Sequence, residues 1–209
     1  MLWLVIGGVG SGKSAFAWRL AEALGREAIL LACPAWPDDS GRLPAPERPS
    51  GTQPAFRWKM LRADADAARK FEEINFSSNP FRIDQRVVVF DGLAGWLRGQ
   101  IARERDASAK PDAAPDSAFA RLDAALDETL GAILGFDGRR IVVTEEPLAG
   151  LAADPWERWY LARLSAANLR LASACAGMYR LTAGAATELK GSRTKRGNVH
   201  HETLYPKGR

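Results

Sequence analysis

The stretch that decides the fold is Gly7–Ser14, which reads "GGVGSGKS" and lies between an apolar run, "LWLVI", and a helical pattern, "AFAWRLAEAL". The spacing of Gly7, Gly12, Lys13 and Ser14 fits a phosphate-binding loop. Glycines let successive backbone N–H groups converge on phosphate oxygens, and the following helix presents its electropositive end to the same anion. The pattern therefore predicts a site for the phosphates of a nucleotide.

Two side chains of this loop have predicted roles of their own. Lys13 can reach the β- and γ-phosphates, and the Ser14 hydroxyl can join the ligands of Mg²⁺. ATP and GTP both remain candidates, because the sequence contains no short signature for recognising a base. The residues expected to bind the nucleotide are Gly7, Gly8, Val9, Gly10, Ser11, Gly12, Lys13 and Ser14.

Short apolar runs alternate with longer helical patterns along the chain. Strands are expected at Leu2–Ile6, Ala28–Ala32, Arg86–Asp91, Arg140–Thr144 and Met178–Thr182. Helices are expected at about 13–25, 59–74, 92–105, 116–135 and 155–175. Strands that are apolar throughout are buried on both faces, as in parallel sheets covered by helices. We predict one doubly wound α/β domain over residues 1–190, of the P-loop NTPase (RecA-like) type, with helices on both faces of a mostly parallel sheet.

The helix expected at 155–175 has a clear beginning and a clear buried side. Asp154 precedes Pro155, which is the usual order of an N-cap and a first helical residue. Trp156 and Trp159 then follow at helical spacing, so they are predicted to pack on the sheet as part of the core.

Carboxylates follow two of the predicted strands. Asp91 ends "VVVFDG", and the strand end "IVVTEEPLAG" supplies Thr144, Glu145 and Glu146. Carboxyl ends of parallel strands meet at the edge of the sheet where ligands bind, so these groups should lie beside the phosphate loop. Asp91 is predicted to bind Mg²⁺, directly or through water. A helix N-cap is the alternative role for this residue, and the two roles can coexist. One carboxylate of the Glu145–Glu146 pair is expected to assist the metal, a substrate hydroxyl or a ribose, and a solvated acidic turn is the alternative.

Composition is that of a soluble globular protein. The chain has 209 residues, of which 46% are hydrophobic and 26% charged, with a formal net charge of +4. No apolar run approaches the roughly 20 residues of a membrane span, and no signal-peptide pattern is visible, so a cytoplasmic location is expected. Cys33 and Cys175 lie in apolar surroundings and are expected to be buried free thiols.

Three stretches interrupt the regular pattern. Pro34–Gln53 and Asp106–Asp116 are rich in proline, alanine or small polar residues and are predicted to be surface loops. Residues 191–209 are predicted to be a basic, flexible tail. Its positive charge raises the hypothesis of a nucleic-acid-associated NTPase, although a solvated tail without a partner explains the same residues.

These pieces, in this order, resemble the bifunctional adenosylcobinamide kinase / adenosylcobinamide-phosphate guanylyltransferases of cobalamin biosynthesis. The resemblance covers about residues 2–190 and depends on "LVIGGVGSGKSAFAWRLAE", "VVVFDGLAGWL" and "VVTEEPLAGLAADPWERWYLARLSAANLRLASACAGMYRLTAG". Within it, Glu146 matches the glutamate of a Thr-Asn-Glu-type turn in the family, and Asn168 matches a helix asparagine. It implies a transferase that binds a nucleoside triphosphate and a small-molecule corrinoid and that forms a homo-oligomer, a trimer in related enzymes.

Family members similar to this chain phosphorylate the aminopropanol hydroxyl of adenosylcobinamide, commonly with GTP, and then transfer GMP through a histidine nucleophile. The equivalent stretch here is "PERPSGTQPAFRWKMLRA", in which Trp58 matches a family tryptophan but no histidine is present. The two histidines of the sequence, His200 and His201, lie in the predicted tail. A covalent guanylyl intermediate needs a nucleophile such as imidazole. Guanylyl transfer is therefore doubtful in this chain.

A second departure from the family lies in the helix expected at 155–175. The family pattern has Arg-Asp followed by Gly, whereas this sequence has Leu161, Ala162 and Ser165. Two interpretations follow. In the first, the protein is a Mg²⁺-dependent kinase of adenosylcobinamide, with Lys13, Asp91 and Glu146 as catalytic residues and Ser14 and Asp91 as metal ligands. In the second, it is a P-loop nucleotide-binding protein with a changed acceptor or a regulatory role in assembly.

Overall fold

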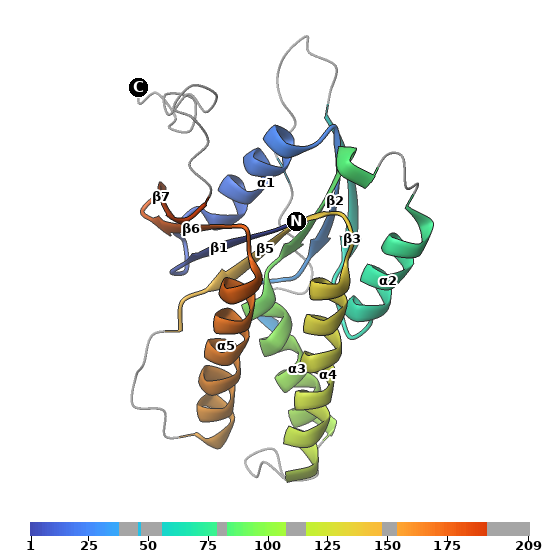
Figure 1. The fold of residues 1–209 in the computed structure, drawn as a ribbon. Helices are drawn as coiled ribbons and strands as arrows, with labels where there is room; N and C mark the ends of the chain where they lie inside the picture. The colour runs from blue at the N-terminus through green and yellow to red at the C-terminus, as the bar shows by residue number, and fades with distance from the viewer. Residues whose placement is uncertain (38–45, 47–55, 79–82, 108–115, 148–153, 192–209) are drawn as a thin grey trace.

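The computed structural model describes residues 1–37, 46, 56–78, 83–107, 116–147 and 154–191 (Figure 1). Within these ranges one sheet is formed by β1 (Leu2–Gly7), β2 (Glu27–Ala32), β3 (Arg57–Arg62), β4 (Arg86–Asp91), β5 (Arg139–Glu145), β6 (Gly177–Thr182) and β7 (Ala185–Lys190). The helices are α1 (Lys13–Leu24), α2 (Ala67–Ser77), α3 (Leu93–Ala107), α4 (Asp116–Gly135) and α5 (Pro155–Ala174), with a short 3-10 turn, η2, at Ile83–Gln85.

The strand order is β3-β2-β4-β5-β1-β6-β7. Strands β1 to β6 are parallel to their neighbours, and β7 is antiparallel to β6. Strand β1 pairs with β5 and β6 instead of β2, the next strand in the chain. This arrangement brings the carboxyl end of β1 beside that of β5, with Gly7 opposite Glu145, and places the end of β4 one strand further along.

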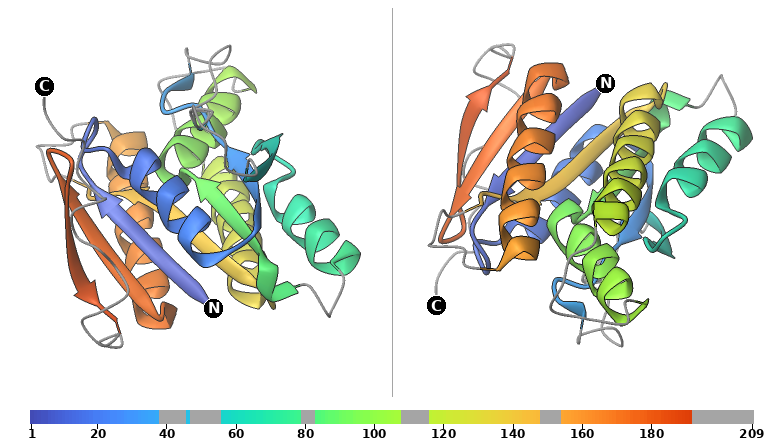
Figure 2. Two further views of the ribbon diagram at one scale, coloured as in Figure 1. Left: turned by 90° about the horizontal axis from the view of Figure 1, so that it is seen from above. Right: turned by 90° about the horizontal axis from the view of Figure 1, so that it is seen from below.

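Helices cover both faces of the sheet, as predicted, but unequally. Helix α1 packs on one face, where Phe16 and Ala17 join the core. Helices α2, α3, α4 and α5 pack on the other face (Figure 2). Successive residues of β2 alternate between the two cores, with Ile29 and Leu31 on the four-helix side and Leu30 on the α1 side. Continuous apolar strands are therefore buried on both faces, and the doubly wound α/β fold class is confirmed.

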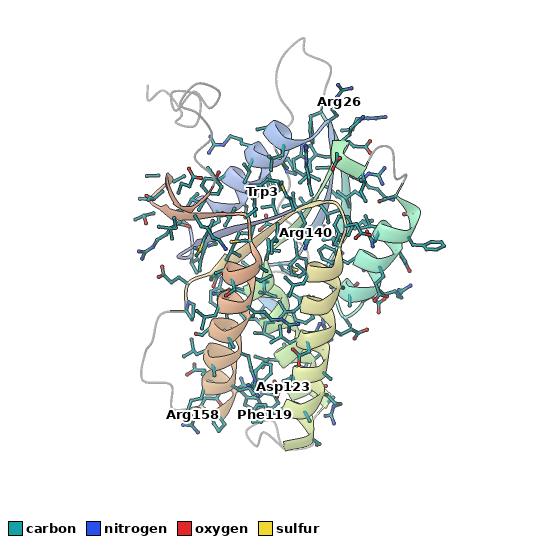
Figure 3. All side chains as sticks on the ribbon, in the orientation of Figure 1. Trp3, Arg26, Phe119, Asp123, Arg140 and Arg158 are labelled. Carbon is teal, nitrogen blue, oxygen red and sulfur yellow. The ribbon has the colours of Figure 1, made fainter. Side chains whose placement is uncertain are left out.

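The N-terminal part of α5 packs on α4 through aromatic side chains. Asp154 caps the helix, since its carboxylate accepts a hydrogen bond from the Trp156 backbone N–H at 2.9 Å. Phe119 of α4 meets the Trp156 ring edge-on, with centroids 5.2 Å apart, and stacks on the Trp159 ring at 5.9 Å (Figure 3). Both tryptophans are buried, so the predicted cap and the predicted burial are confirmed, but the two rings pack on α4 and not on the sheet as expected.

A buried arginine joins the end of α4 to the sheet. The Arg140 guanidinium, on β5, donates hydrogen bonds to the carbonyl oxygens of Phe136 and Leu134, the latter at 2.7 Å (Figure 3). These carbonyls are the acceptors that a helix leaves unpaired at its C-terminus. Burial lowers the pKa of Arg140. The contact fixes the position in the sheet at which β5 begins. It therefore also fixes the position of the other end of β5, which lies at the site.

The expected helix at 59–74 is wrong over its first part. Residues Arg57–Arg62 form β3, an edge strand paired with β2, and α2 begins only at Ala67. Lys59, Met60 and Leu61 are residue types that also favour helices, so local propensity misplaced the boundary. The strand forms because β2 offers a free edge. The short strand β7 was not predicted at all.

Other expectations have mixed outcomes. Cys33 and Cys175 are buried free thiols, as predicted. No helix among the described residues is long and apolar enough to cross a membrane. Most of the loops predicted at Pro34–Gln53 and Asp106–Asp116 lies outside the described residues, as does the tail at 192–209. The tail therefore stays a prediction.

Candidate functional site

The loop between β1 and α1 has the backbone that the glycine pattern predicts. Gly10 and Gly12 adopt positive φ values of 70° and 87°, which favour glycine, and Gly12 is the residue from which α1 begins. A Cβ on Gly7 would lie 2.5 Å from the Leu181 carbonyl oxygen, so this position lacks room for a side chain. The backbone N–H of Gly184 donates to the Ser11 carbonyl at 3.1 Å. The loop is thus held against β6 and its turn.

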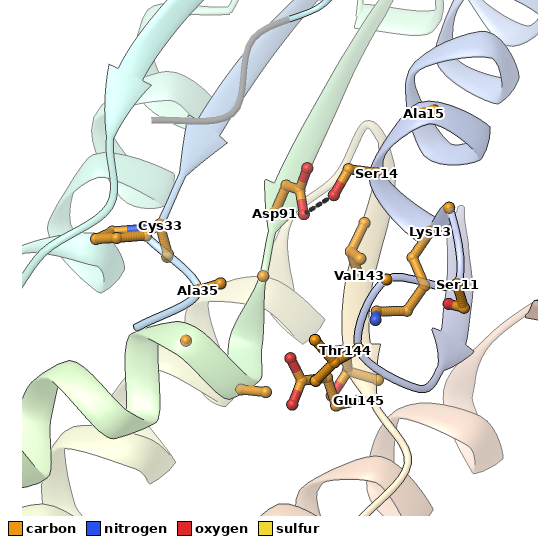
Figure 4. A pocket seen from close by; sticks show the side chains of 17 residues that line it. Ser11, Lys13, Ser14, Ala15, Cys33, Ala35, Asp91, Val143, Thr144 and Glu145 are labelled. Atoms are coloured by element: carbon orange, nitrogen blue, oxygen red, sulfur yellow. Dashed lines mark hydrogen bonds between the residues drawn. The ribbon is translucent and has the colours of Figure 1, made fainter. Parts of the chain in front are cut away.

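Lys13 and Ser14, the first two residues of α1, reach from the loop toward the strand ends. The Lys13 ammonium donates to the Gly8 carbonyl at 2.6 Å, folding over its own loop. The Ser14 hydroxyl donates to the Asp91 carboxylate at 3.0 Å (Figure 4). Burial lowers the pKa of Lys13, while the nearby carboxylates of Glu145 and Asp91 oppose that shift. The predicted grouping of Lys13, Ser14 and Asp91 is present in the structure.

The Asp91 carboxylate has the properties of a cation ligand. It is 4% exposed, and burial raises its pKa to about 6, although the Ser14 hydrogen bond, the Lys13 charge and the nearby Trp18 indole N–H act to lower it. Its second oxygen, Oδ2, is buried and accepts no hydrogen bond of ordinary geometry from the described residues. A buried oxygen with a free lone pair beside a hydroxyl suits Mg²⁺, which binds few protein oxygens and keeps waters and phosphate oxygens as other ligands.

A fuller protein cage for a metal is not seen. Among the described residues, no group of three or more His, Cys, Asp or Glu side chains converges. Ser14 and Asp91 would supply only some of the ligands of a cation, and phosphate oxygens and waters would supply the others. The Ser14–Asp91 pair is the part of the described chain that would hold it.

The end of β5 is tied to α5 by an asparagine. The Thr144 hydroxyl donates to the Asn168 side-chain oxygen at 2.9 Å, and the Asn168 amide donates to the Glu145 carbonyl, also at 2.9 Å. Asn168 is buried, so these two hydrogen bonds replace those that its side chain would make with water. The asparagine thus fixes the backbone from which Glu145 projects.

The Glu145 side chain forms an ion pair with Arg98, a residue that was not predicted to belong to the site. The Arg98 guanidinium, on α3, holds both carboxylate oxygens of Glu145, one of them at 3.3 Å. Arg98 also donates to the Ala35 carbonyl at 2.9 Å. Its charge lies 4.2 Å from the centre of the Trp36 ring and 5.3 Å from that of Tyr160. Arg98 therefore joins β5, α5 and the segment after β2 in one cluster.

The Tyr160 ring closes this cluster from α5. Burial raises the pKa of Tyr160 to about 12, and none of the described residues hydrogen-bonds its hydroxyl.

The one sequence signal for Arg98 was its position as the lone charge in "GLAGWLRGQIA". Such a charge within an apolar helix needs a partner, but the sequence does not say which one.

The Glu146 side chain lies outside the cluster around Arg98. Its carboxylate pairs with Arg180 of β6 at 2.9 Å, and both side chains are about half exposed. It does not line the cavity that contains Lys13, whereas Glu145 does. The structure thus assigns the two adjacent glutamates to different surroundings, which the sequence had left open.

A cavity of about 800 Å³ lies along the carboxyl edge of the sheet, and Lys13, Asp91 and Glu145 are among the residues that line it (Figure 4). Its walls include the loop from Val9 to Ala15, the strand ends at Asp91 and Glu145, and the segment Cys33–Ala35 beyond β2. Gly7 and Gly8, also predicted to bind the nucleotide, are not part of its walls. This volume is in the range of ligand pockets for small molecules. The fold and the cavity together define a P-loop nucleotide-binding protein.

Comparison with known proteins gives the family. A family model described as cobinamide kinase / cobinamide phosphate guanyltransferase matches residues 3–189. The chain therefore belongs to that family, as the resemblance implied. No curated protein matches the chain.

Two solved structures show distant likeness. One is described as an ATPase domain, with 10% identity, a TM-score of 0.42, and coverage of 87% of this chain and 69% of that one. The other is a prototypical ATPase from the type III secretion system of pathogenic bacteria, with 17% identity, a TM-score of 0.42, and coverage of 87% and 52%.

Proposed function

We propose that this protein is a Mg²⁺-dependent kinase that transfers the γ-phosphoryl group of ATP or GTP to the hydroxyl of adenosylcobinamide. The observation that carries the proposal is the 3.0 Å hydrogen bond between Ser14 and the buried Asp91, beside Lys13 on a glycine loop. Hydroxyl, carboxylate and ammonium at this spacing are the parts that phosphoryl transfer needs. Family membership supports the corrinoid as acceptor.

Different residues of the cavity have different roles in the reaction. The loop amides and Lys13 stabilise negative charge on the transferring phosphoryl group. Mg²⁺, when bound at Ser14 and Asp91, supplies further neutralisation of that charge. In the transfer, a bond forms between the acceptor oxygen and the γ-phosphorus. The bond to the oxygen bridging the β- and γ-phosphates breaks, and the nucleoside diphosphate leaves with the electron pair.

We propose that Glu145, and not Glu146, contacts the acceptor hydroxyl. Glu145 lines the cavity and is held in one orientation by Arg98, so its carboxylate is placed to accept the hydroxyl proton. Glu146, paired with Arg180 at a half-exposed position, lacks such access. Phosphoryl transfer depends mainly on positioning, so a fixed carboxylate contributes even if proton transfer is late.

We further propose that histidine-dependent guanylyl transfer is absent. Residues 3–189, which match the family, contain no histidine. Covalent transfer of GMP needs a nucleophile that is regenerated near neutral pH, and serine or threonine without a base does not provide one. The kinase step has no such requirement. The trimer implied by the resemblance remains a prediction.

The test is a product assay by mass spectrometry with purified protein, Mg²⁺, adenosylcobinamide and either GTP or ATP. We expect adenosylcobinamide phosphate and no GMP adduct on the corrinoid or on the protein. The Lys13→Ala variant serves as control and should give no product. GDP-linked cobinamide would contradict the absence of guanylyl transfer and direct attention to His200 and His201. Nucleotide binding without any product would contradict the kinase and support a changed acceptor or a regulatory role.

A further inference from the structure

A second pocket opens beside the nucleotide cavity. Its volume is about 240 Å³, and it shares Cys33, Pro34 and Gly95 with the larger cavity. Its other walls come from the end of β3, at Arg62–Asp64, and from one side of α3. The phosphate loop, Asp91 and Glu145 do not line it. The pocket thus extends the site away from the phosphates.

The two pockets lie side by side along the carboxyl edge of the sheet, separated by Cys33–Pro34 where Pro34 packs on Gly95, and together they are called the trough. The phosphate loop follows β1, and β3 is four strands away in the order β1-β5-β4-β2-β3. Strands are spaced by about 4.8 Å, so the trough runs roughly 19 Å from one end to the other. Asp91 ends β4, near the middle of this path.

The chemistry of phosphoryl transfer gives each end of the trough a different ligand. The phosphate chain of the nucleotide is bound at the β1 end by the loop. The attacking and leaving oxygens lie roughly in line with the γ-phosphorus. An acceptor therefore approaches from the side of the γ-phosphate that is away from the loop. In this protein that side leads past Asp91 to Cys33–Pro34 and into the second pocket.

The end of β3 is held rigidly at the second pocket. The Lys70 ammonium donates to the Asp64 carboxylate at 2.7 Å and to the Arg62 carbonyl at 2.9 Å. The indole N–H of Trp96 donates to the Asp64 carbonyl at 2.8 Å. The backbone N–H of Ala63 continues the pairing to β2 at 2.8 Å. The pocket is therefore formed before any ligand arrives.

The polar groups of the pocket are of both signs. Arg62 and Arg103 bring guanidinium groups, and Asp64 and Asp106 bring carboxylates. None of the described residues forms an ion pair with Arg103. Guanidinium groups donate hydrogen bonds and carboxylates accept them, so the set matches a ligand that carries both C=O and N–H. Amide groups have this combination, whereas a phosphate would be repelled by the carboxylates.

We infer that the second pocket is the acceptor subsite and that it binds an amide-bearing hydroxyl arm of the corrinoid. This inference rests on the proposed kinase function. The pocket is smaller than the pockets that enclose drug-sized ligands. It therefore takes only the arm, while the ring system stays at the mouth of the trough. The hydroxyl at the end of the arm then crosses over Cys33–Pro34, the wall between the two pockets, toward the γ-phosphate.

The α3 wall of the pocket offers a sharp test. Gly99 lines the pocket, and a Cβ added there would meet only the end of the flexible Arg103 side chain, at 3.9 Å. The Gly99→Leu variant should fold, and its leucine side chain should occupy the pocket. Gly131 of α4 is the matched control, since it is also a helical glycine, with nothing within 4 Å of an added Cβ. Both changes raise helix propensity equally, but only Gly99→Leu obstructs the trough.

The experiment measures binding of adenosylcobinamide by equilibrium dialysis, read by the visible absorbance of the corrin. The full-length protein is held with Mg²⁺ and a GTP analogue whose β–γ bond cannot be cleaved. We expect Gly99→Leu and Arg103→Ala to weaken corrinoid binding at least tenfold, with analogue affinity changed less than twofold. Gly131→Leu and Arg69→Ala, an exposed arginine on α2, should match the unaltered protein.

The outcomes separate this inference from the kinase proposal. Corrinoid affinity that is unchanged in both Gly99→Leu and Arg103→Ala overturns the acceptor subsite but leaves the kinase proposal intact. A parallel loss of analogue affinity also overturns it, because the pocket would then belong to the nucleotide. If the unaltered protein binds the analogue but no corrinoid, the acceptor of the proposed function is wrong and the inference falls with it.

Discussion

The adjacent glutamates Glu145 and Glu146 allow the assignment of the site to be tested by one matched pair of variants. Each is replaced by glutamine, which keeps the shape of the side chain and removes its charge. Glu145 is 16% exposed and is paired with Arg98, itself 15% exposed. Glu146 is 42% exposed and paired with Arg180 at 52%. The two changes are identical in chemistry and differ in surroundings.

The structure sets the expected loss of stability for each change. A hydrogen bond to a charged group contributes about 1.5–3 kcal/mol, and glutamine keeps one acceptor for Arg98, so we expect Glu145→Gln to cost about 2 kcal/mol. For a chain of this size, each kcal/mol lowers Tm by about 2–4 °C. An exposed ion pair contributes about 0–1 kcal/mol. The Glu146→Gln change should therefore lower Tm by no more than about 4 °C.

The difference in activity should be larger. A positioned acid or base contributes about 10²–10⁴-fold to rate, or roughly 3–5 kcal/mol at 1.36 kcal/mol per tenfold. We expect kcat to fall by this amount in Glu145→Gln and by less than about threefold in Glu146→Gln. The assay is initial-rate formation of phosphorylated corrinoid, with nucleotide KM measured alongside. Comparable activity in the two variants, or a larger loss in Glu146→Gln, would refute the placement of Glu145 at the acceptor hydroxyl.

Further predictions concern the loop, the helix contact and the thiols. Lys13→Ala should reduce kcat by at least about 10³-fold, because it removes a charge from the transition state, while circular dichroism stays unchanged. Gly95→Val should destabilise the protein to urea by about 1–3 kcal/mol, since an added Cβ would lie 2.3 Å from the Pro34 carbonyl oxygen; unaltered stability would show that this contact is loose. Burial raises the pKa of the Cys33 and Cys175 thiols, so neither should react rapidly with a thiol reagent at pH 8 until denaturant is added.

The parts of the site that could be predicted are those fixed by local sequence. Gly7–Ser14 carries its own backbone requirements, and Asp91 could be placed because a buried strand ends there before a glycine. Their meeting at 3.0 Å follows from parallel strands that share one carboxyl edge. The sheet order itself did not need to be known, because any doubly wound order brings these ends to the same side.

Other features depend on contacts that sequence does not encode locally. Strand β3 forms because it pairs with β2, although its residues also suit a helix. Arg98 is a site residue only because α3 places it against Glu145 and Trp36. The choice between the two glutamates was likewise set by the partners that the fold gives each one, Arg98 for Glu145 and Arg180 for Glu146. In all three, tertiary packing decided between alternatives of similar local preference.

Under the proposed function, the arrangement accounts for kinase activity without the histidine that the resemblance led us to expect. Lys13, Ser14 and Asp91 are positioned by β1, α1 and β4, and none of these elements includes the segment 34–58. That segment contacts the cavity at its beginning, where Arg98 donates to the Ala35 carbonyl. Loss of a nucleophile further along the segment would therefore leave these electrostatic groups in place. Covalent transfer depends on one imidazole, whereas phosphoryl transfer depends on charge held by the sheet edge. The two activities are therefore separable by sequence change, and the proposed function assigns only phosphoryl transfer to this chain.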